Sequence, residues 1–367
     1  MKTSGNYCII TIVSELQQQI FHSQGDNGMS IYKEKDGLRY DMEQIWESGS
    51  SDQFPKNITN LVEDYKSIEE YMNEHCHPNA TLGAAVNIDG LLTDHGPDHI
   101  RMVAENAKQL VGDFSLRRLN GYEIYLLLLA IHFHDVGNCF GREEHEKKID
   151  EVMCALGDKL PLDTAERLMV SDIATAHGGY TSGSTEDKDT LKPLKSIDSC
   201  NGITIRPALL AAILRFADEL SDDNTRCNRF LDKLGVIPPE NQIFHAYSAA
   251  LAPITFNGNV IDFKYYIPYE QSQEKIPNED GSFLYDEIMK RLKKCMRELE
   301  YCRKYAEGFI RITTLNVELN VMDARITHRP KVSTRFTLRL SGYPNEFAGS
   351  IDSLEYQNGV ELKSATL

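Results

Sequence analysis

The chain has 367 residues, of which 41% are hydrophobic and 26% are charged, and its formal net charge is −16. Such a composition is typical of a soluble globular protein with a large core, and the acidic balance argues against broad capture of nucleic acid or of an anionic membrane. No run of 18 or more apolar residues predicts a membrane span, and neither a signal peptide nor a disulfide framework is expected, so we predict a cytoplasmic protein.

The first 80 residues are expected to form an N-terminal helical or partner-binding region. A polar run at 47–55 predicts a loop or linker, and the spacing of apolar residues predicts a helix over 58–75. His75, Cys76 and His77 follow that helix. Because no second cluster lies at a suitable spacing, we expect a loop here rather than a metal site.

Residues 81–238 are expected to form a helical domain. Helices are predicted over 96–113, 122–136, 143–156, 163–176 and 206–220. The second of these is so apolar that it should lie in the core, and Asp163 with Glu166 predicts a capping box at the start of the fourth. The polar segment 180–202 is expected to be a surface loop that could serve as a lid.

Strand-like segments appear in the sequence after Pro238 and Pro239, and a smaller α+β region is expected over 239–367. Strands are predicted over 243–252, 260–269, 309–321 and 332–340, with a helix over 283–305. A turn is expected at 257–259. The expected fold class is therefore mainly α, a helical bundle followed by an α+β region.

Four histidines and two aspartates on or beside five successive predicted helices need a common explanation. They are His99, His134, Asp135, His145, His177 and Asp218. One buried histidine alone is more often a satisfied core residue than a ligand, but six polar groups among apolar helix faces each cost free energy unless they are paired or metal-bound. Imidazole and carboxylate groups suit Mn, Fe, Mg, Ni or Zn, so a divalent metal centre is expected.

The ordered set resembles the HD superfamily of metal-dependent phosphohydrolases. The stretches Thr93–Val103, His134–Gly137 and Leu214–Leu220 are similar to the branch found beside Hsp90-like ATPases. The resemblance covers roughly residues 90–230 and implies an HD-type helical bundle.

The resemblance also implies a ligand set for two metal ions. One ion would be held by His99, His134, Asp135 and Asp218, and Asp135 would bridge to a second ion held by His145 and His177. Two such ions lower the pKa of a shared water and stabilise the charge of in-line attack on phosphorus, so Asp135 is also a catalytic candidate.

Three other residues are candidates at the same centre. His95 precedes His99 by one helical turn and is a candidate ligand or proton donor, although a solvated loop residue is an equally good interpretation. Arg142 and Arg226 are candidates for clamping phosphate oxygens, although either could equally well form a surface ion pair.

The sequence differs from the motifs of three known subclasses of the superfamily, and these differences limit the subclass that it can resemble. Asn138 stands where cyclic-di-GMP enzymes of the HD-GYP type usually carry a lysine, and their tyrosine-proline signature is missing. The Glu-Asp pair typical of guanosine-tetraphosphate hydrolases is also absent. The stretch Gly137–Glu146 is similar to one in dNTP triphosphohydrolases, but it is shorter and lacks the first histidine of that stretch.

We therefore expect an enzyme, a phosphohydrolase or phosphodiesterase that acts on a nucleotide-like phosphoester through a metal-activated water. One alternative is a non-catalytic metal- and ligand-binding regulatory module in a multi-protein system. Another is a dNTP triphosphohydrolase or a nuclease, and the acidic balance disfavours the nuclease. A small phosphorylated substrate, an Hsp90-like ATPase and a second copy of the chain are the candidate partners.

Overall fold

The protein is described here from a computed structural model. The structure describes residues 54–55, 61–86, 95–111, 119–181, 183–227, 234–277, 281–306, 308–323, 329–340, 350–352 and 354–366. The linker predicted at 47–55 lies mostly outside the described residues.

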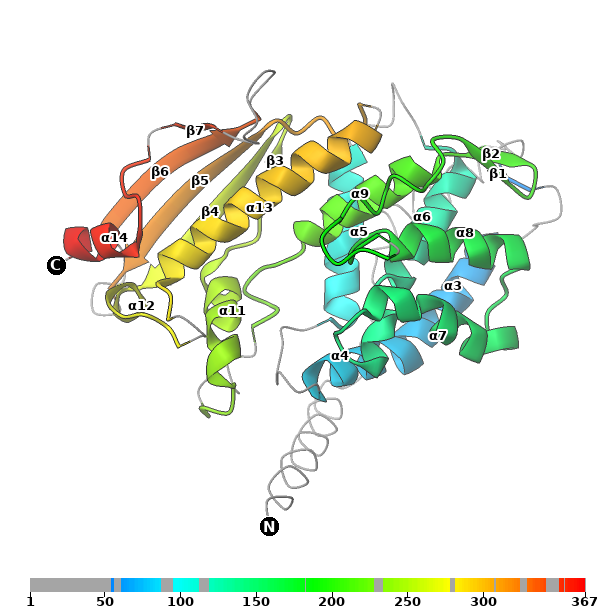
Figure 1. Ribbon diagram of the computed structural model, residues 1–367, viewed down its shortest axis with the longest axis horizontal. Helices are drawn as coiled ribbons and strands as arrows, with labels where there is room; N and C mark the ends of the chain where they lie inside the picture. Colours follow the sequence, from blue (N-terminus) through cyan, green and yellow to red (C-terminus); the bar gives the residue numbers. More distant parts are fainter. Residues whose placement is uncertain are drawn as a thin grey trace, which may run out of the picture.

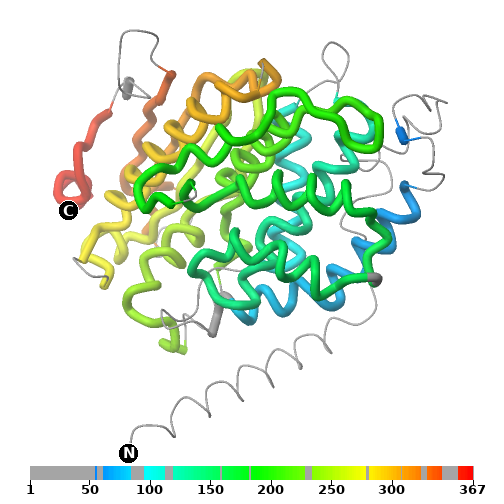
Figure 2. The backbone as a smooth tube through the Cα atoms, turned by 45° about the vertical axis from the view of Figure 1, so that its right-hand side comes forward, coloured from blue at the N-terminus to red at the C-terminus, as the bar shows by residue number. Residues whose placement is uncertain are grey.

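Helices form the part of the molecule drawn on the right of Figure 1, and a sheet with a long helix forms the part on the left. The helical part contains α3 (Leu61–Tyr71), α4 (His77–Val86), α5 (Pro97–Val111), α6 (Gly121–Phe133), α7 (Ile149–Leu156), α8 (Thr164–Thr175) and α9 (Pro207–Glu219). Figure 2 shows these helices packed against one another, with the C-terminal segment at the far edge of the molecule. The mainly α fold with a smaller α+β region is confirmed.

Helix α6 is the core of the helical part, because all 13 of its residues are buried. Asn120 and Glu123 form a capping box at its start, and Arg206 pairs with the buried Glu123 at 2.6 Å between Nη2 and Oε2. The capping box predicted for α8 at Asp163 and Glu166 is also present. These boxes satisfy backbone N–H groups that the first turn of a helix would otherwise leave without a partner in the helix.

The loop expected around His77 is in fact helical. Helix α3 continues through a π-helical turn, η2 (Met72–Cys76), directly into α4. Pro78 explains the π-helical turn, because a proline inside a helix removes one backbone donor and its ring clashes with the carbonyl four residues earlier. The wider turn absorbs that clash, and the His77 N–H instead donates to the carbonyl of Met72.

Two other segments of the helical part differ from the prediction. The expected loop after Val136 is a 3-10 helix, η3 (Val136–Phe140), and His145 begins another, η4 (His145–Lys148), so that α7 starts only at Ile149. The short 3-10 helices let the chain bend by 103° between Gly121–Phe140 and His145–Leu156. His145 therefore stands at a bend, not on a long helix.

The segment 180–202, expected to be a surface loop that could serve as a lid, is anchored near its middle. Leu191 is completely buried, and its N–H donates to the hydroxyl of Tyr301 at 2.9 Å. The segment ends in a hairpin that the sequence did not predict, formed by β1 (Asp198–Cys200) and β2 (Ile203–Ile205). Such anchoring argues against a lid that swings as a whole.

Among the residues that the structure describes, the α+β part consists of a five-stranded sheet and four helices. Its strands are β3 (Thr255–Asn257), β4 (Val260–Pro268), β5 (Thr314–Met322), β6 (Val332–Arg339) and β7 (Ser350–Asp352), and they lie in that order across the sheet. Its helices are α11 (Pro239–Ala250), α12 (Tyr269–Gln273), α13 (Leu284–Tyr305) and α14 (Gly359–Thr366). The pair β4–β5 is parallel and is connected through α12 and α13, and the other pairs are antiparallel.

The strand predicted over 243–252 is wrong, because this segment is helix α11. Pro239 occupies the first turn, where its missing N–H costs nothing. The buried residues Ile243, Ala246, Tyr247 and Ala250 recur at helical spacing. The predicted helix over 283–305 and the strands over 260–269 and 332–340 are confirmed, whereas the strand predicted from 309 begins only at Thr314.

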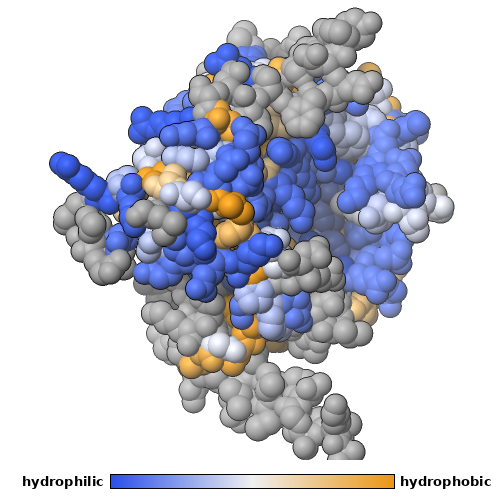
Figure 3. All heavy atoms as spheres, turned by 60° about the vertical axis from the view of Figure 1, so that its left-hand side comes forward, coloured by the Kyte–Doolittle hydropathy of each residue, from blue (hydrophilic) through white to orange (hydrophobic). Residues whose placement is uncertain are grey.

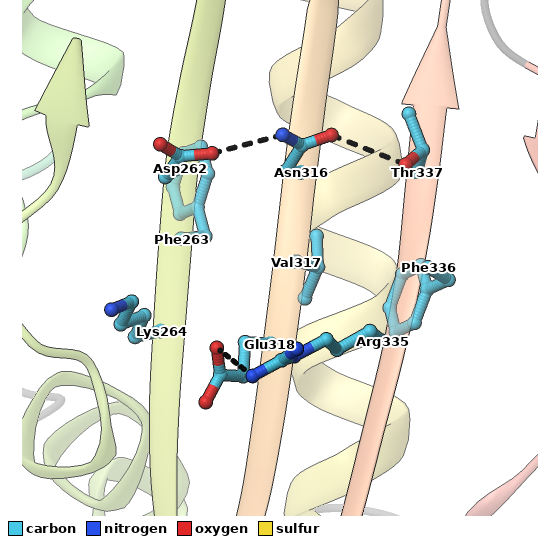
Figure 4. A pocket seen from close by; sticks show the side chains of 9 residues that line it. All are labelled: Asp262, Phe263, Lys264, Asn316, Val317, Glu318, Arg335, Phe336 and Thr337. Carbon is cyan, nitrogen blue, oxygen red and sulfur yellow. Dashed lines mark hydrogen bonds and ion pairs between the residues drawn. The ribbon is translucent and has the colours of Figure 1, made fainter. Parts of the chain in front are cut away.

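One face of the sheet packs against α13, and the opposite face is polar (Figure 1, Figure 4). Two rows of side chains cross strands β4, β5 and β6 there: Asp262, Asn316 and Thr337, and then Lys264, Glu318 and Arg335. Hydrogen bonds of 3.0 and 3.1 Å join the first row, and an ion pair of 3.2 Å joins Glu318 to Arg335. The pocket over these strands contains none of the clustered histidines.

The hydrophobic core is continuous between the two parts. Buried residues from Phe54 to Leu362 belong to one cluster of contacts. Figure 3 shows that the surface on its visible side is mainly hydrophilic, with small separate apolar patches. Within the described ranges no single helix is long and apolar enough to cross a membrane, although the bent pair Gly121–Phe140 and His145–Leu156 passes the same test together.

Candidate metal centre

Seven of the residues singled out from the sequence converge beside the C-terminal end of α6. They are His95, His99, His134, Asp135, His145, His177 and Asp218. Their potential ligand atoms form three overlapping groups, and within each group all atoms lie within 4.8 Å of one another. All seven residues are buried except Asp218, whose side chain is 29% exposed.

The two oxygens of Asp135 face different sets of imidazoles. Oδ2 lies 3.4 Å from His99 Nε2 and 3.3 Å from His134 Nε2. Oδ1 lies 3.1 Å from His145 Nε2 and 3.9 Å from His177 Nε2. The geometry thus contains two adjacent groups of potential ligands that share one carboxylate.

Asp218 joins only the first of these groups. Its Oδ1 lies 3.2 Å from His99 Nε2 and 3.6 Å from His134 Nε2. Helix α9 supplies this carboxylate at its last turn, after a run of buried residues that fixes the helix against α5. Residues far apart in the chain therefore complete the first group.

Backbone contacts fix which nitrogen of three histidines faces the centre. His134, His145 and His177 each donate Nδ1–H to the carbonyl three residues earlier, at 2.7, 3.1 and 2.6 Å. Because a carbonyl only accepts, the proton of each neutral ring lies on Nδ1 and the lone pair lies on Nε2. The Nε2 atoms of His145 and His177 face each other at 3.3 Å, and two lone pairs at this distance repel unless a cation lies between them. This donor set fits a divalent metal ion.

The charge states of Asp135, Asp218 and His177 also favour a divalent cation at the centre. Burial opposes ionisation of Asp135, but His134 and His95 outweigh it and hold the pKa of Asp135 well below its usual range. Burial likewise opposes ionisation of Asp218, but His134 and His99 hold its pKa low. Burial together with His134 lowers the pKa of His177 to about 3. Two anionic carboxylates beside a neutral imidazole attract a divalent cation.

The same two carboxylates act on the pKa of His134. Burial lowers the pKa of His134, but Asp135 and Asp218 raise it to about 10. The ring then takes up a proton that satisfies the carboxylates. A bound metal ion would replace that proton and restore the Nε2 lone pair as a ligand.

His95, which belongs to the centre, links it to Arg226, and Arg142 borders it directly. The Nδ1–H of His95 donates to Asp135 Oδ2 at 2.7 Å, and Arg226 Nη2 lies 3.4 Å from the His95 ring nitrogens. Arg142 Nη1 lies 3.5 Å from Asp135 Oδ1, and its side chain is 43% exposed. Arg142 therefore contacts Oδ1 of Asp135, whereas Arg226 contacts the imidazole that is bonded to Oδ2.

One buried polar group beside the centre was not foreseen from the sequence. His132, two residues before His134, contacts Tyr65 and His77. The His-Phe-His spacing was the available signal, but it places His132 and His134 about 200° apart around an ideal helix. His132 therefore lies on the side of α6 that faces α3 and α4.

Gly137 allows the two 3-10 helices to approach closely. A Cβ atom at this position would lie 1.9 Å from the carbonyl oxygen of His145. We expect Gly137→Ala to displace His145, to reduce the bound metal per chain, and to cost about 1–3 kcal/mol of stability through the overpacked contact. Metal analysis and thermal unfolding test this expectation. Gly178→Ala is the control, because a Cβ there meets nothing within 4 Å, and equal metal content in both variants would contradict the expectation.

The helical bundle and the His/Asp cluster around His134 and Asp135 define an HD-type domain. Residues 89–299, more than half of the chain, match the family model described as HD-CE. The chain therefore belongs to the HD-CE family. No curated protein and no solved structure matches the chain.

Proposed function

We propose that the protein is a metal-dependent phosphohydrolase or phosphodiesterase that acts on a nucleotide-like phosphoester. The main support for this proposal is the position of the Asp135 carboxylate. Its two oxygens face two separate sets of imidazole nitrogens. When bound, two divalent ions would lower the pKa of a water and stabilise the charge that develops on phosphorus.

Each side of the centre has its own proposed ligands. His99, His134 and Asp218 would hold one ion together with Asp135 Oδ2, and His145 and His177 would hold the second with Oδ1. Nitrogen and carboxylate ligands of this kind are compatible with Mn, Fe, Mg, Ni or Zn. The fixed Nδ1–H bonds of His134, His145 and His177 keep their Nε2 atoms turned toward the ions.

The arginines supply the proposed contacts to the substrate. Arg142 combines contact with the centre and exposure to solvent, so its guanidinium is placed to meet a phosphoryl oxygen of an entering substrate. Arg226 would act from the side of His95. Because burial, the largest influence, lowers the pKa of His95 to about 3, its ring stays neutral at neutral pH, and we assign it to orienting Asp135 rather than to donating a proton.

Burial of the centre favours a small substrate over a polymer. Of the seven histidine and aspartate side chains at the centre, only that of Asp218 is more than a tenth exposed. A nucleic-acid strand needs an open basic groove, whereas a nucleotide can present its phosphates end-on. The proposed substrate is therefore a nucleotide-like compound, with deoxynucleoside triphosphates among the candidates.

A regulatory role is the second candidate. The same His/Asp centre would hold metal and ligand without turnover, in the cytoplasm, with an Hsp90-like ATPase as the partner. The support for this partner is the sequence resemblance of Thr93–Val103 and Leu214–Leu220. Co-purification of the full chain with such an ATPase tests the association.

A metal analysis joined to a substrate panel tests the main proposal. We expect the purified protein to retain about two divalent ions per chain, in line with the two sets of ligands. Hydrolysis of at least one of a set of nucleotides, cyclic dinucleotides and a generic phosphodiester should be lost with a chelator and restored by added metal. Absence of bound metal would overturn the proposal. Bound metal without turnover across the panel would support the regulatory role instead.

A further inference from the structure

We propose that Tyr65, His77 and His132 form a hydrogen-bonded brace that positions the C-terminal turn of α6 and, through it, His134 and Asp135. The three residues are positioning residues, because they act through the proposed ligands and not on a substrate. The inference rests on the proposed function, since it concerns the orientation of the side chains that would hold metal.

The brace joins three helices through fully buried side chains. The Tyr65 hydroxyl lies 2.9 Å from His132 Nε2, and His77 Nε2 lies 3.1 Å from His132 Nδ1. The exposed fraction is 0% for Tyr65 and His132 and 1% for His77. Both ring nitrogens of His132 are therefore engaged, one by α3 and the other by α4, which restricts rotation of this part of α6 in both directions.

The π-helical turn η2 is what allows both contacts to be made from one helical rod. Tyr65 and His77 are 12 positions apart, which in an ideal α-helix would leave them about 120° apart around the axis. One extra residue in a π-helical turn takes back about 100°. The two side chains thereby fall on the same face of the rod, opposite His132. A π-helical turn of this kind is frequent at functional sites.

Helix α4 also holds the chain on the other side of Asp135. A Cβ atom at Gly83 would lie 2.0 Å from the backbone carbonyl oxygen of Asn138, so α4 rests directly on η3. The helix therefore contacts the segment before Asp135 through His77 and the segment after it through Gly83. These two contacts set the position of the shared carboxylate from both ends.

Packing alone does not account for the chemistry of the brace. Replacing hydrogen-bonded partners with apolar groups of the same shape is often nearly neutral for stability. Apolar contacts tolerate sliding and rotation of a helix, whereas hydrogen bonds require a narrow range of distance and angle. A polar link at this place defines the orientation of α6 where the proposed ligands need it.

Tyr65→Phe tests the brace by removing one hydroxyl group. The matched control is Tyr122→Phe, which removes a buried, hydrogen-bonded hydroxyl from the opposite end of α6. We measure metal affinity by competition with a chelator, the absorption spectrum of the Co²⁺-loaded protein, and the melting temperature. We expect Tyr65→Phe to weaken metal binding about tenfold and to change the Co²⁺ spectrum, as loss of an outer contact of a metal site does. Tyr122→Phe should change only the melting temperature.

A second pair of variants separates hydrogen bonding from bulk. His77→Gln keeps a polar atom near the position of Nε2 and should retain most of the metal affinity, whereas His77→Leu should not. Equal metal affinity and an unchanged Co²⁺ spectrum in Tyr65→Phe and His77→Leu would overturn the brace and leave the proposed function standing. Failure of the unaltered protein to bind Co²⁺ would overturn the proposed function, and the brace with it.

Discussion

Asp135→Ala is expected to remove both metal ions and all phosphoester hydrolysis. The carboxylate is the group common to both sets of potential ligands, with Oδ1 facing His145 and Oδ2 facing His99 and His134. Without it, the second group has no carboxylate and the first keeps only Asp218, which leaves too little negative charge to offset a divalent ion in a buried site. Metal content should fall from about two ions per chain to near zero.

The control for this substitution is a second aspartate near the end of α9. Asp222 accepts a hydrogen bond from Ser248 at 2.6 Å and pairs with Arg291 at 3.3 Å. Asp222→Ala should therefore lower stability without removing metal. Elemental analysis, hydrolysis of the best substrate and thermal unfolding are measured for both variants. Retention of both ions in Asp135→Ala would exclude the shared-carboxylate arrangement.

Arg215→Ala is expected to be strongly destabilising, by about 3–5 kcal/mol, because it leaves a largely buried carboxylate without its partner. The Arg215 guanidinium forms a bidentate salt bridge with Glu298, at 2.7 Å from Nε to Oε2 and 3.0 Å from Nη2 to Oε1. It also donates to the Thr190 hydroxyl at 2.7 Å and lies 4.6 Å from the centre of the Tyr301 ring. Denaturant unfolding at equilibrium measures the loss.

An ion pair between two exposed side chains is the control. Arg101 pairs with Asp98 on α5 at 3.2 Å, and their side chains are 45% and 69% exposed. Arg101→Ala should therefore cost no more than about 1 kcal/mol. The double variant Arg215→Met with Glu298→Leu should recover part of the loss, because apolar residues of similar volume often replace a buried pair at little cost. Similar losses for Arg215→Ala and Arg101→Ala would contradict this interpretation.

Ion pairs between α9 and α13 also show how the α+β part reaches the candidate centre. Helices α9 and α13 are joined at successive turns by Arg215 with Glu298, by Glu219 with Lys294, and by Asp222, just beyond α9, with Arg291. Asp218 lies on α9 within this series. The position of its carboxylate therefore depends on α13, a helix that packs on the sheet.

Local patterns were sufficient to predict much of the helical part. The strongly apolar run of α6, the capping box of α8 and the spacing of His99 with Val103 and Ala107 depend on neighbours a few residues away. Such signals predict the helices and identify the polar groups that their buried faces must satisfy. The ordered His and Asp residues can accordingly be recognised from the sequence alone.

Other features depended on contacts between distant segments. The spacing within 243–252 was compatible with either a strand or a helix, and packing against α13 and β4 decided for α11. Pro78 indicated the end of a helix, yet the chain continues through a π-helical turn because α3 and α4 both pack beneath α6. A proline signal states only where a regular helix is interrupted, not whether the chain turns away.

By itself the sequence determined which residues could form a metal centre, because their chemical types and their helical spacing are local properties. Only the tertiary structure decided that Asp135 faces both sets of imidazoles, that His132 turns toward Tyr65 and His77, and that α13 supports Asp218. The physical reason is that hydrogen bonds and ion pairs act over a few ångströms, and the chain brings such partners together only when its core is packed.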